Sequence, residues 1–333
     1  MAHSFVSWKQ RGFTLIELMV ALALGLILVA VATQLFIGGL LSSRLQKANA
    51  EIQDSGIFGL EYIARDIRLL NYGNVTNPIL TDTTPWGGVV LTASTATNNN
   101  NVNFVPNVGT NTYIADTLLS RGAGDTVSTV SNHWKGLSNI QNSSNTAVQS
   151  DQLTIQFIAP TNMTNCEGVN VLAGDLIVER YFLRLDSNGS SQQDYALACD
   201  ANTPSAVATA QPTTVAGLGD AGQIVLPRID HFHVLFGAKN AAGNFAYYTI
   251  PQYRAAAQAA RDATPSVMPP RILSIQISVL ARSTNNAQSK AIDPEQSFFM
   301  LDQTVHASDN TTRFLRRTYN LTIALRNAMG ESL

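Results

Sequence analysis

Apolar residues are concentrated in one stretch near the N-terminus. Between Glu17 and Arg44 lie 26 residues without a charge, and about 20 apolar residues are enough for a helix to cross a bilayer. The stretch therefore predicts a membrane-spanning helix. Lys9 and Arg11 stand just before it, and basic flanks favour the cytoplasmic side of a membrane. We therefore expect a cytoplasmic N-terminus and an exported remainder.

The helix is predicted to continue over 42–71 as an amphipathic segment. Its apolar positions follow one another at steps of three and four, which is the spacing of one helix face. They are Leu45, Ala48, Ile52, Gly56, Leu60, Ile63, Ile67 and Leu70. The charged residues lie largely off this stripe, so we expect the stripe to pack on a globular head. Gly56 and Gly59 are predicted to weaken the helix locally, and Asn71-Tyr72-Gly73 predicts its end.

Residues 72–333 show the pattern of a β-rich head. From residue 151 onward apolar and polar residues alternate with a period of two, which predicts strands. The strand segments are "DQLTIQFIAP", "GDLIVERYFLRLD", "QDYALAC", "RIDHFHVLFG", "FAYYTIP", "RILSIQISVLARS" and "RFLRRTYNLTIALRN". Short turns between neighbours predict hairpins and a mainly antiparallel sheet, and Arg254–Arg261 predicts one short helix. The expected fold class is α+β.

Segment 74–150 has a different texture, because it is rich in Thr, Asn, Ser and Gly. Such composition predicts solvated loops. Gly88–Thr92 and Asp125–Val130 are the two weak strand candidates inside it. We expect no binding role for these loops from composition alone.

Composition narrows the function classes. Charged residues make up 13% of the chain and the formal net charge is -2, against about 25% charged residues in an average protein. No field of one sign is available to attract nucleic acid or an acidic membrane surface.

No motif for catalysis, phosphate binding or metal binding is present, so we expect no catalytic residue, no metal and no cofactor. His231 and His233 share one face of a strand and could ligate a metal, but a third ligand is not evident. Half-exposed strand histidines are the preferred interpretation. Asp186, Asn188 and Asp194 lack the spacing of a calcium loop and are interpreted as a hairpin turn.

The chain has two cysteines, Cys166 and Cys199. In an oxidising compartment they are expected to pair, which would tie loop 161–171 to a hairpin and stabilise the fold by about 3–4 kcal/mol in the loop-entropy model. Two buried free thiols are the alternative.

Glu17 is the residue that a simple membrane anchor leaves unexplained. A carboxylate inside the hydrocarbon costs on the order of 2–3 kcal/mol. An ordinary cleaved signal peptide is a poor alternative, because the apolar core is too long.

The residues Gly12-Phe13-Thr14-Leu15-Ile16-Glu17 resemble the class III signal of type IV prepilins. The resemblance implies a leader over 1–12 with its charges at Lys9 and Arg11, and a filament-core helix over 13–41. It also implies that prepilin peptidase cuts after Gly12 and N-methylates the new terminal residue, Phe13. In a filament the Glu17 carboxylate would neutralise the Phe13 amine of a neighbouring subunit, which would set the axial register.

A second resemblance lies near the C-terminus. The segments "ILSIQISVLARS" and "RRTYNLTIALRN" are similar to the C-terminal pattern of PilW-type minor pilins and of the related GspJ-type pseudopilins. This implies a type IV pilin-like fold and a structural protein rather than an enzyme. Arg316, Arg317 and Arg326 could form a docking edge or lie on the solvent face of a strand, and the second interpretation is preferred.

Together the resemblances imply a single-pass inner-membrane precursor with a periplasmic head, later incorporated into pili on the cell surface. The implied partners are other minor pilins, the major pilin, prepilin peptidase, the pilus assembly platform and a PilY-type tip adhesin. The implied role is to prime assembly at or near the tip. A GspJ-like role in type II secretion is the first alternative, and a membrane-anchored periplasmic enzyme or binding protein is the second.

Overall fold

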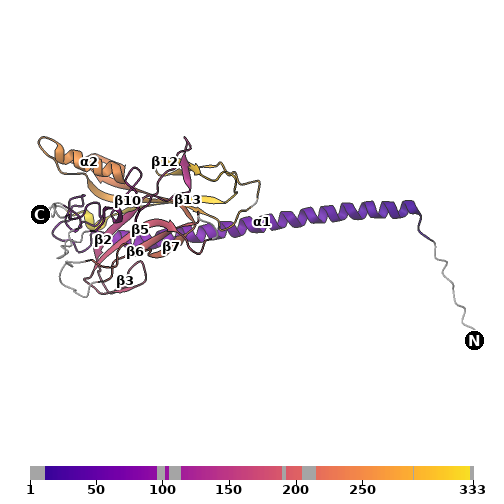
Figure 1. Ribbon diagram of the computed structural model, residues 1–333, viewed down its shortest axis with the longest axis horizontal. Coiled ribbons are helices and arrows are strands. Elements are labelled where there is room, and N and C mark those ends of the chain that lie inside the picture. The colour runs from indigo at the N-terminus through magenta and orange to yellow at the C-terminus, as the bar shows by residue number, and fades with distance from the viewer. Residues whose placement is uncertain are drawn as a thin grey trace, which may run out of the picture. The chain divides into compact units, whose positions relative to one another are not determined.

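The structure is a computed structural model that describes residues 12–95, 102–104, 114–189, 193–204, 215–287 and 289–330, with only the backbone at 54 and 55. The chain divides into two compact units, Met1–Lys47 and Ala48–Leu333. The helix α1 (Leu15–Leu69) begins in the first unit and ends in the second. The predicted long N-terminal helix is therefore confirmed, and Gly56 and Gly59 do not interrupt it (Figure 1).

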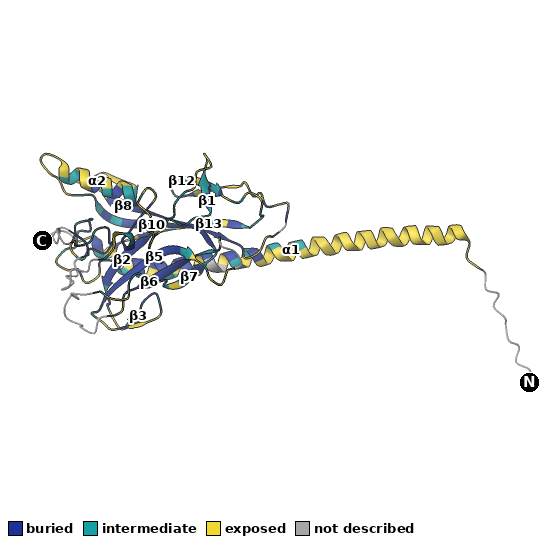
Figure 2. Cartoon of the chain, viewed as in Figure 1, coloured by how far each residue is buried: buried dark blue, intermediate teal, exposed yellow. Residues whose placement is uncertain are grey.

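Within the second unit, α1 buries the stripe that its spacing predicts. The buried members are Ala48, Ile52, Gly56, Leu60, Ile63, Ile67 and Leu70. Five of them, Ile52, Leu60, Ile63, Ile67 and Leu70, belong to a core that also contains residues from the strands, so this part of the helix lies in the head's interior (Figure 2). After Leu69 the chain turns away from the helix, with positive φ at Asn71 and Gly73, two residue types that tolerate the left-handed region. The predicted helix end is confirmed.

Two four-stranded sheets make up most of the head, and every pairing in them is antiparallel. The first has the order β2-β5-β6-β7, and its strands are Leu153–Ile158, Leu176–Leu185, Tyr195–Ala201 and Gln223–Pro227. The second has the order β13-β10-β8-β9, and its strands are Arg316–Ala324, Arg271–Arg282, Ile229–Lys239 and Phe245–Thr249. The α+β class with a mainly antiparallel head is confirmed (Figure 1).

Smaller elements complete the head. A three-stranded sheet has the order β1-β12-β11, with strands Ile140–Asn142, Gln303–Ala307 and Ser297–Met300. The pair β3-β4 joins Met163–Thr164 to Asn170–Val171. The helix α2 spans Ile250–Asp262, wider than the predicted Arg254–Arg261, because a capping box at Thr249 starts it earlier. The short 3-10 helices η1 and η2 span Asp116–Leu118 and Arg326–Ala328.

The two weak strand candidates in the Thr- and Asn-rich segment are wrong. Gly88–Thr92 forms only an isolated bridge, from Val89 to Ile155 of β2. Asp125–Val130 forms no strand, because no neighbouring strand pairs with it within the described part of the chain. Alternation alone does not make a strand unless a partner supplies the ladder of hydrogen bonds.

The two glycines of the stripe have a packing role that helix propensity alone does not reveal. A Cβ added to Gly59 would lie 1.9 Å from Cδ2 of Leu226, and one added to Gly56 would lie 2.3 Å from the Tyr319 ring. Leu226 is buried in β7. The absence of a side chain therefore lets α1 approach the strands closely at these two positions.

We predict that Gly59→Ala lowers the free energy of unfolding of the head by about 1–2 kcal/mol, since overpacking costs about 1–3 kcal/mol and exceeds the helix propensity gained. Gly38→Ala is the matched control on the same helix, because nothing lies within 4 Å of a Cβ there. Urea unfolding of the detergent-solubilised chain measures both. Equal stabilities would mean that the core around Leu226 relaxes freely.

Candidate functional site

The start of α1 is closed by a reciprocal pair of hydrogen bonds. The Thr14 backbone N–H donates to the Glu17 carboxylate at 3.4 Å, and the Glu17 backbone N–H donates to the Thr14 hydroxyl at 3.3 Å. This is a capping box, in which two backbone donors of the first helical turn gain partners. The T-x-x-E spacing was visible in the sequence, and its capping role was missed. In the single chain Glu17 therefore stabilises the start of its own helix.

The segment that follows is apolar and has no cover in the single chain. Every described side chain from Gly12 to Leu40 is exposed, and Phe13 and Leu15 are 83% and 80% exposed. Among the described residues, α1 is the one helix with a window long and apolar enough to cross a membrane. Exposed apolar surface on this scale is unfavourable in water. Lipid or other apolar helices are the surroundings that suit it.

Two buried carboxyl groups meet where α1 packs on β5. The Tyr181 hydroxyl lies 3.0 Å from the Asp66 carboxyl group and 3.1 Å from that of Glu179, and all three residues are fully buried. The Tyr181 hydroxyl has one proton and can donate to only one of the two carboxyl groups. The other carboxyl group must therefore be protonated and donate to the hydroxyl oxygen. Burial and the neighbouring Asp66 raise the pKa of Glu179 to about 8. The pair shares one proton at neutral pH.

The disulfide lies beside this carboxyl pair. Cys166 and Cys199 are bonded, with their Cα atoms 6.1 Å apart. The Cys166 N–H donates to Glu179 at 2.8 Å, and the Tyr62 hydroxyl on α1 donates to the Cys166 carbonyl at 3.3 Å. The helix, the β3–β4 turn and the β5–β6 hairpin are thus joined at one place.

His231 and His233 are buried, so the prediction of half-exposed histidines is wrong. Their rings stack on one face of β8 with centroids 6.1 Å apart. His233 lies 2.8 Å from both Asp151 and Asp302, and Asp302 belongs to the turn between β11 and β12, which covers this face. Burial alone would lower the pKa of His233, but the two carboxylates outweigh it and raise that pKa to about 10. The pair is a structural link between sheets.

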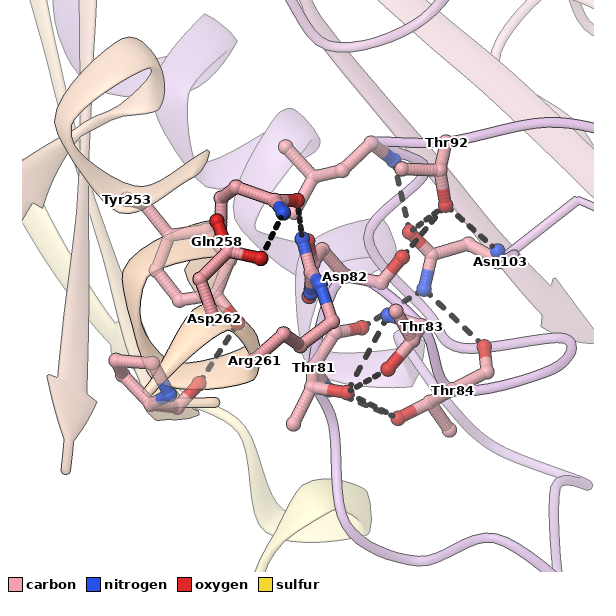
Figure 3. A network of polar contacts seen from close by, with 12 residues as sticks. Thr81, Asp82, Thr83, Thr84, Thr92, Asn103, Tyr253, Gln258, Arg261 and Asp262 are labelled. Carbon is pink, nitrogen blue, oxygen red and sulfur yellow. Dashed lines mark hydrogen bonds and ion pairs between the residues drawn. The ribbon is translucent and has the colours of Figure 1, made fainter. Parts of the chain in front are cut away.

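Parts of the Thr- and Asn-rich segment are ordered by side-chain hydrogen bonds rather than left as solvated loop (Figure 3). The Asn103 amide donates to the carbonyl groups of Thr81 and Thr84 at 2.7 and 3.1 Å. Arg261 of α2 donates to both oxygens of Asp82 at 2.8 Å (Figure 3). Buried amide and hydroxyl groups take the place that β ladders have elsewhere in the head.

Two hollows border this network, and Thr83 lines both. One of about 680 Å³ is mainly apolar, and Val75, Pro78, Ile79, Met268 and Pro269 are among its lining residues. The other, of about 520 Å³, is polar and has Asp116, Arg121, Arg254 and Arg261 in its wall. Both are concave surfaces that a partner could contact.

The arginines near the C-terminus do not form one docking edge. Arg316 is buried and donates to Asp230 at 2.7 Å. Arg317 and Arg326 are exposed. Solvent-face charges are the correct description for these two, and a buried ion pair is the correct description for Arg316.

Two regions of the chain match models of known protein families. Residues 180–327 match the family model "Type IV Pilus-assembly protein W", PilW. Residues 9–33 match the prokaryotic N-terminal methylation motif, which includes Gly12, Phe13 and Glu17.

Among solved structures, the chain is similar to the type IV-like pilin TTHA1219 from Thermus thermophilus, at 12% identity and a TM-score of 0.37 over 83% of this chain and 97% of that one. A search of curated proteins gave no match.

The carboxyl pair generates a prediction about pH. Glu179 has an ordinary pKa of 4.5 when unfolded and about 8 in the native head, so the native state keeps a proton that the unfolded state releases. The free energy of unfolding should therefore fall as pH rises from about 4.5 to about 8. Urea titrations across this range should show a shallower fall for Glu179→Gln. Glu61→Gln, exposed on α1, is the control, and an unchanged slope in Glu179→Gln would contradict the shared proton.

Proposed function

We propose that this chain is a minor pilin of the PilW family that is incorporated into type IV pili, on the matches of residues 180–327 to the PilW family model and of residues 9–33 to the N-terminal methylation motif. The observation that carries the proposal is the coincidence of this motif with a long apolar helix that has no cover in the single chain. The matched family concerns type IV pilus assembly, which favours a pilus over a type II secretion pseudopilus.

The apolar half of α1 would have two successive roles, as a membrane anchor and then as a packing surface in the filament. Before assembly it would hold the precursor in the inner membrane, with the head on the periplasmic side. In the filament the same surface would pack on the helices of neighbouring subunits. Apolar burial contributes roughly 25 cal/mol per Å² only for surface removed from water. For helices that leave the bilayer, dispersion contacts with close-packed neighbouring helices replace those with lipid.

Glu17 would set the axial register between neighbouring subunits. Cleavage after Gly12 leaves an ammonium group on Phe13, four residues before Glu17 on the same helix face. In the single chain the carboxylate has only local partners, the hydroxyl and N–H of Thr14. A neighbour's ammonium is a stronger partner in apolar surroundings, because an unpaired charge there is penalised and a paired one is tolerated. Subunits would therefore dock at one axial offset.

The head would make the contacts specific to this subunit. Its two hollows and the loops around them offer shape and polar groups to other minor pilins or to a PilY-type adhesin at the tip. A place at or near the tip, where minor pilins prime filament growth, follows from the family resemblance and is part of the proposal.

We predict that the mature chain begins at Phe13 and carries a methyl group on its amine. Mass spectrometry of the N-terminal peptide, in cells with and without prepilin peptidase, measures this. In the peptidase deletion the leader should remain. An intact leader in wild-type cells, or cleavage at another bond, would contradict the proposal.

We predict that Glu17→Gln inserts into the membrane and is cleaved, yet enters sheared filaments at least about tenfold less than wild type, because a buried unpaired ammonium costs several kcal/mol. Glutamine can complete a capping box but carries no charge, so this variant separates the two roles of Glu17. Thr14→Ala is the matched control, since it weakens the cap and keeps the carboxylate. Normal incorporation of Glu17→Gln, with loss in Thr14→Ala, would assign Glu17 to capping alone.

A further inference from the structure

Three carboxylates converge on the outer side of the disulfide. Glu167 follows Cys166 in the turn between β3 and β4, Asp200 follows Cys199 in β6, and Asp220 lies in the loop before β7. Each brings one carboxylate oxygen to within 4.8 Å of the others. The disulfide holds two of the three together, because it joins the residues that precede them.

One carboxylate oxygen of Asp200 has no hydrogen-bond partner. Its Oδ2 accepts from Nε and a terminal nitrogen of Arg180, at 3.0 and 2.6 Å, and from the Gly219 N–H at 2.9 Å. Asp200 is fully buried, and its Oδ1 has no hydrogen-bond partner. A buried carboxylate oxygen without a partner costs free energy that a ligand can recover.

The loop that carries Asp220 is shaped closely around this place. The Gly222 N–H donates to Asp220 Oδ1 at 2.7 Å. Gly222 has φ +59°, and a Cβ there would lie 2.1 Å from the Cys199 carbonyl oxygen. Only glycine allows the loop to approach β6 this closely, so the position of Asp220 is set by the fold.

The charges around this place do not balance. Arg180 pairs with Asp200, and neither Glu167 nor Asp220 has an ion pair among the described residues, so negative charge is in excess here. A divalent cation would cancel the excess.

We propose that Glu167, Asp200 and Asp220 bind one divalent cation, and that this cation is Ca²⁺. The ligands are all oxygens, which select hard cations over zinc or copper. The three carboxylates supply at least three of the six to eight oxygens that Ca²⁺ takes, and water can supply the rest because Asp220 is exposed. Mg²⁺ is the weaker candidate, since it demands a strict octahedron and gives up its water reluctantly.

Bound Ca²⁺ would join the β3–β4 turn, β6 and the loop before β7 across the disulfide. It would therefore stabilise the head at the edge formed by β7. This inference is independent of the proposed role in pili, because it concerns the folded head alone.

Calcium titration of the full chain in detergent, after EDTA treatment, tests the proposal. Calorimetry should find one site with a Kd of about 0.1–1 mM, the range of extracellular calcium modules. The unfolding midpoint should rise by about 2–4 °C in 10 mM CaCl₂, with a smaller rise in 10 mM MgCl₂. Absence of both heat and midpoint shift would overturn the proposal, and so would equal effects of the two cations.

Two variants separate a cation site from a structural polar cluster. Glu167→Gln and Asp220→Asn should each weaken Ca²⁺ binding at least about tenfold, because each removes a charged ligand, while unfolding in EDTA at the wild-type temperature or above, because each relieves repulsion. Glu295→Gln, an exposed carboxylate in another turn, is the control and should bind like wild type. Variants that bind Ca²⁺ normally, or that unfold early in EDTA and show no calcium effect, would contradict the site.

Discussion

The burial of one helix stripe in the core of the head is the constraint on which the rest of this structure depends. From Ile52 to Leu70 the stripe of α1 lies in the same core as strands of both four-stranded sheets. Neither sheet could bury its inner face without it, and the helix could not hold its end without the sheets. Two glycines, at positions 56 and 59, make the approach close enough. The apolar half of the same helix is thereby fixed, by covalent continuity, to a folded head.

The charged residues of this chain are few, but they are not confined to its surface. Only 13% of the residues are charged, yet a large share of these charges lies inside the head in pairs such as Arg180 with Asp200 and Arg316 with Asp230. Buried ion pairs add little net stability, since desolvation offsets attraction, but breaking one is costly. They suit positions where one arrangement of strands must be favoured over others, and the described pairs join different elements.

The sequence predicted what depends on neighbours along the chain and missed what depends on neighbours in space. The helix stripe, its end at Asn71 and the strands after residue 151 were predictable, because periodicity is a local property. The burial of His233 was not, because the carboxylate that covers it, Asp302, is far away along the chain and reaches it through a turn. The shared proton of Asp66 and Glu179 was missed for the same reason. The capping role of Glu17 was local and legible, but its position in a prepilin-like signal drew attention to assembly instead.

The disulfide relates these interior features to the stage at which the head can finish folding. Cys166 lies between the proton-sharing pair, through its N–H to Glu179, and the carboxylate group that begins at Glu167. Both arrangements need the β3–β4 turn held against β6, and the bond between Cys166 and Cys199 holds it there. Cysteines pair in an oxidising compartment and stay reduced in the cytoplasm. If the head is exported as proposed, the bond forms only after export, and the two acidic groups reach their final geometry at the same stage as the bond.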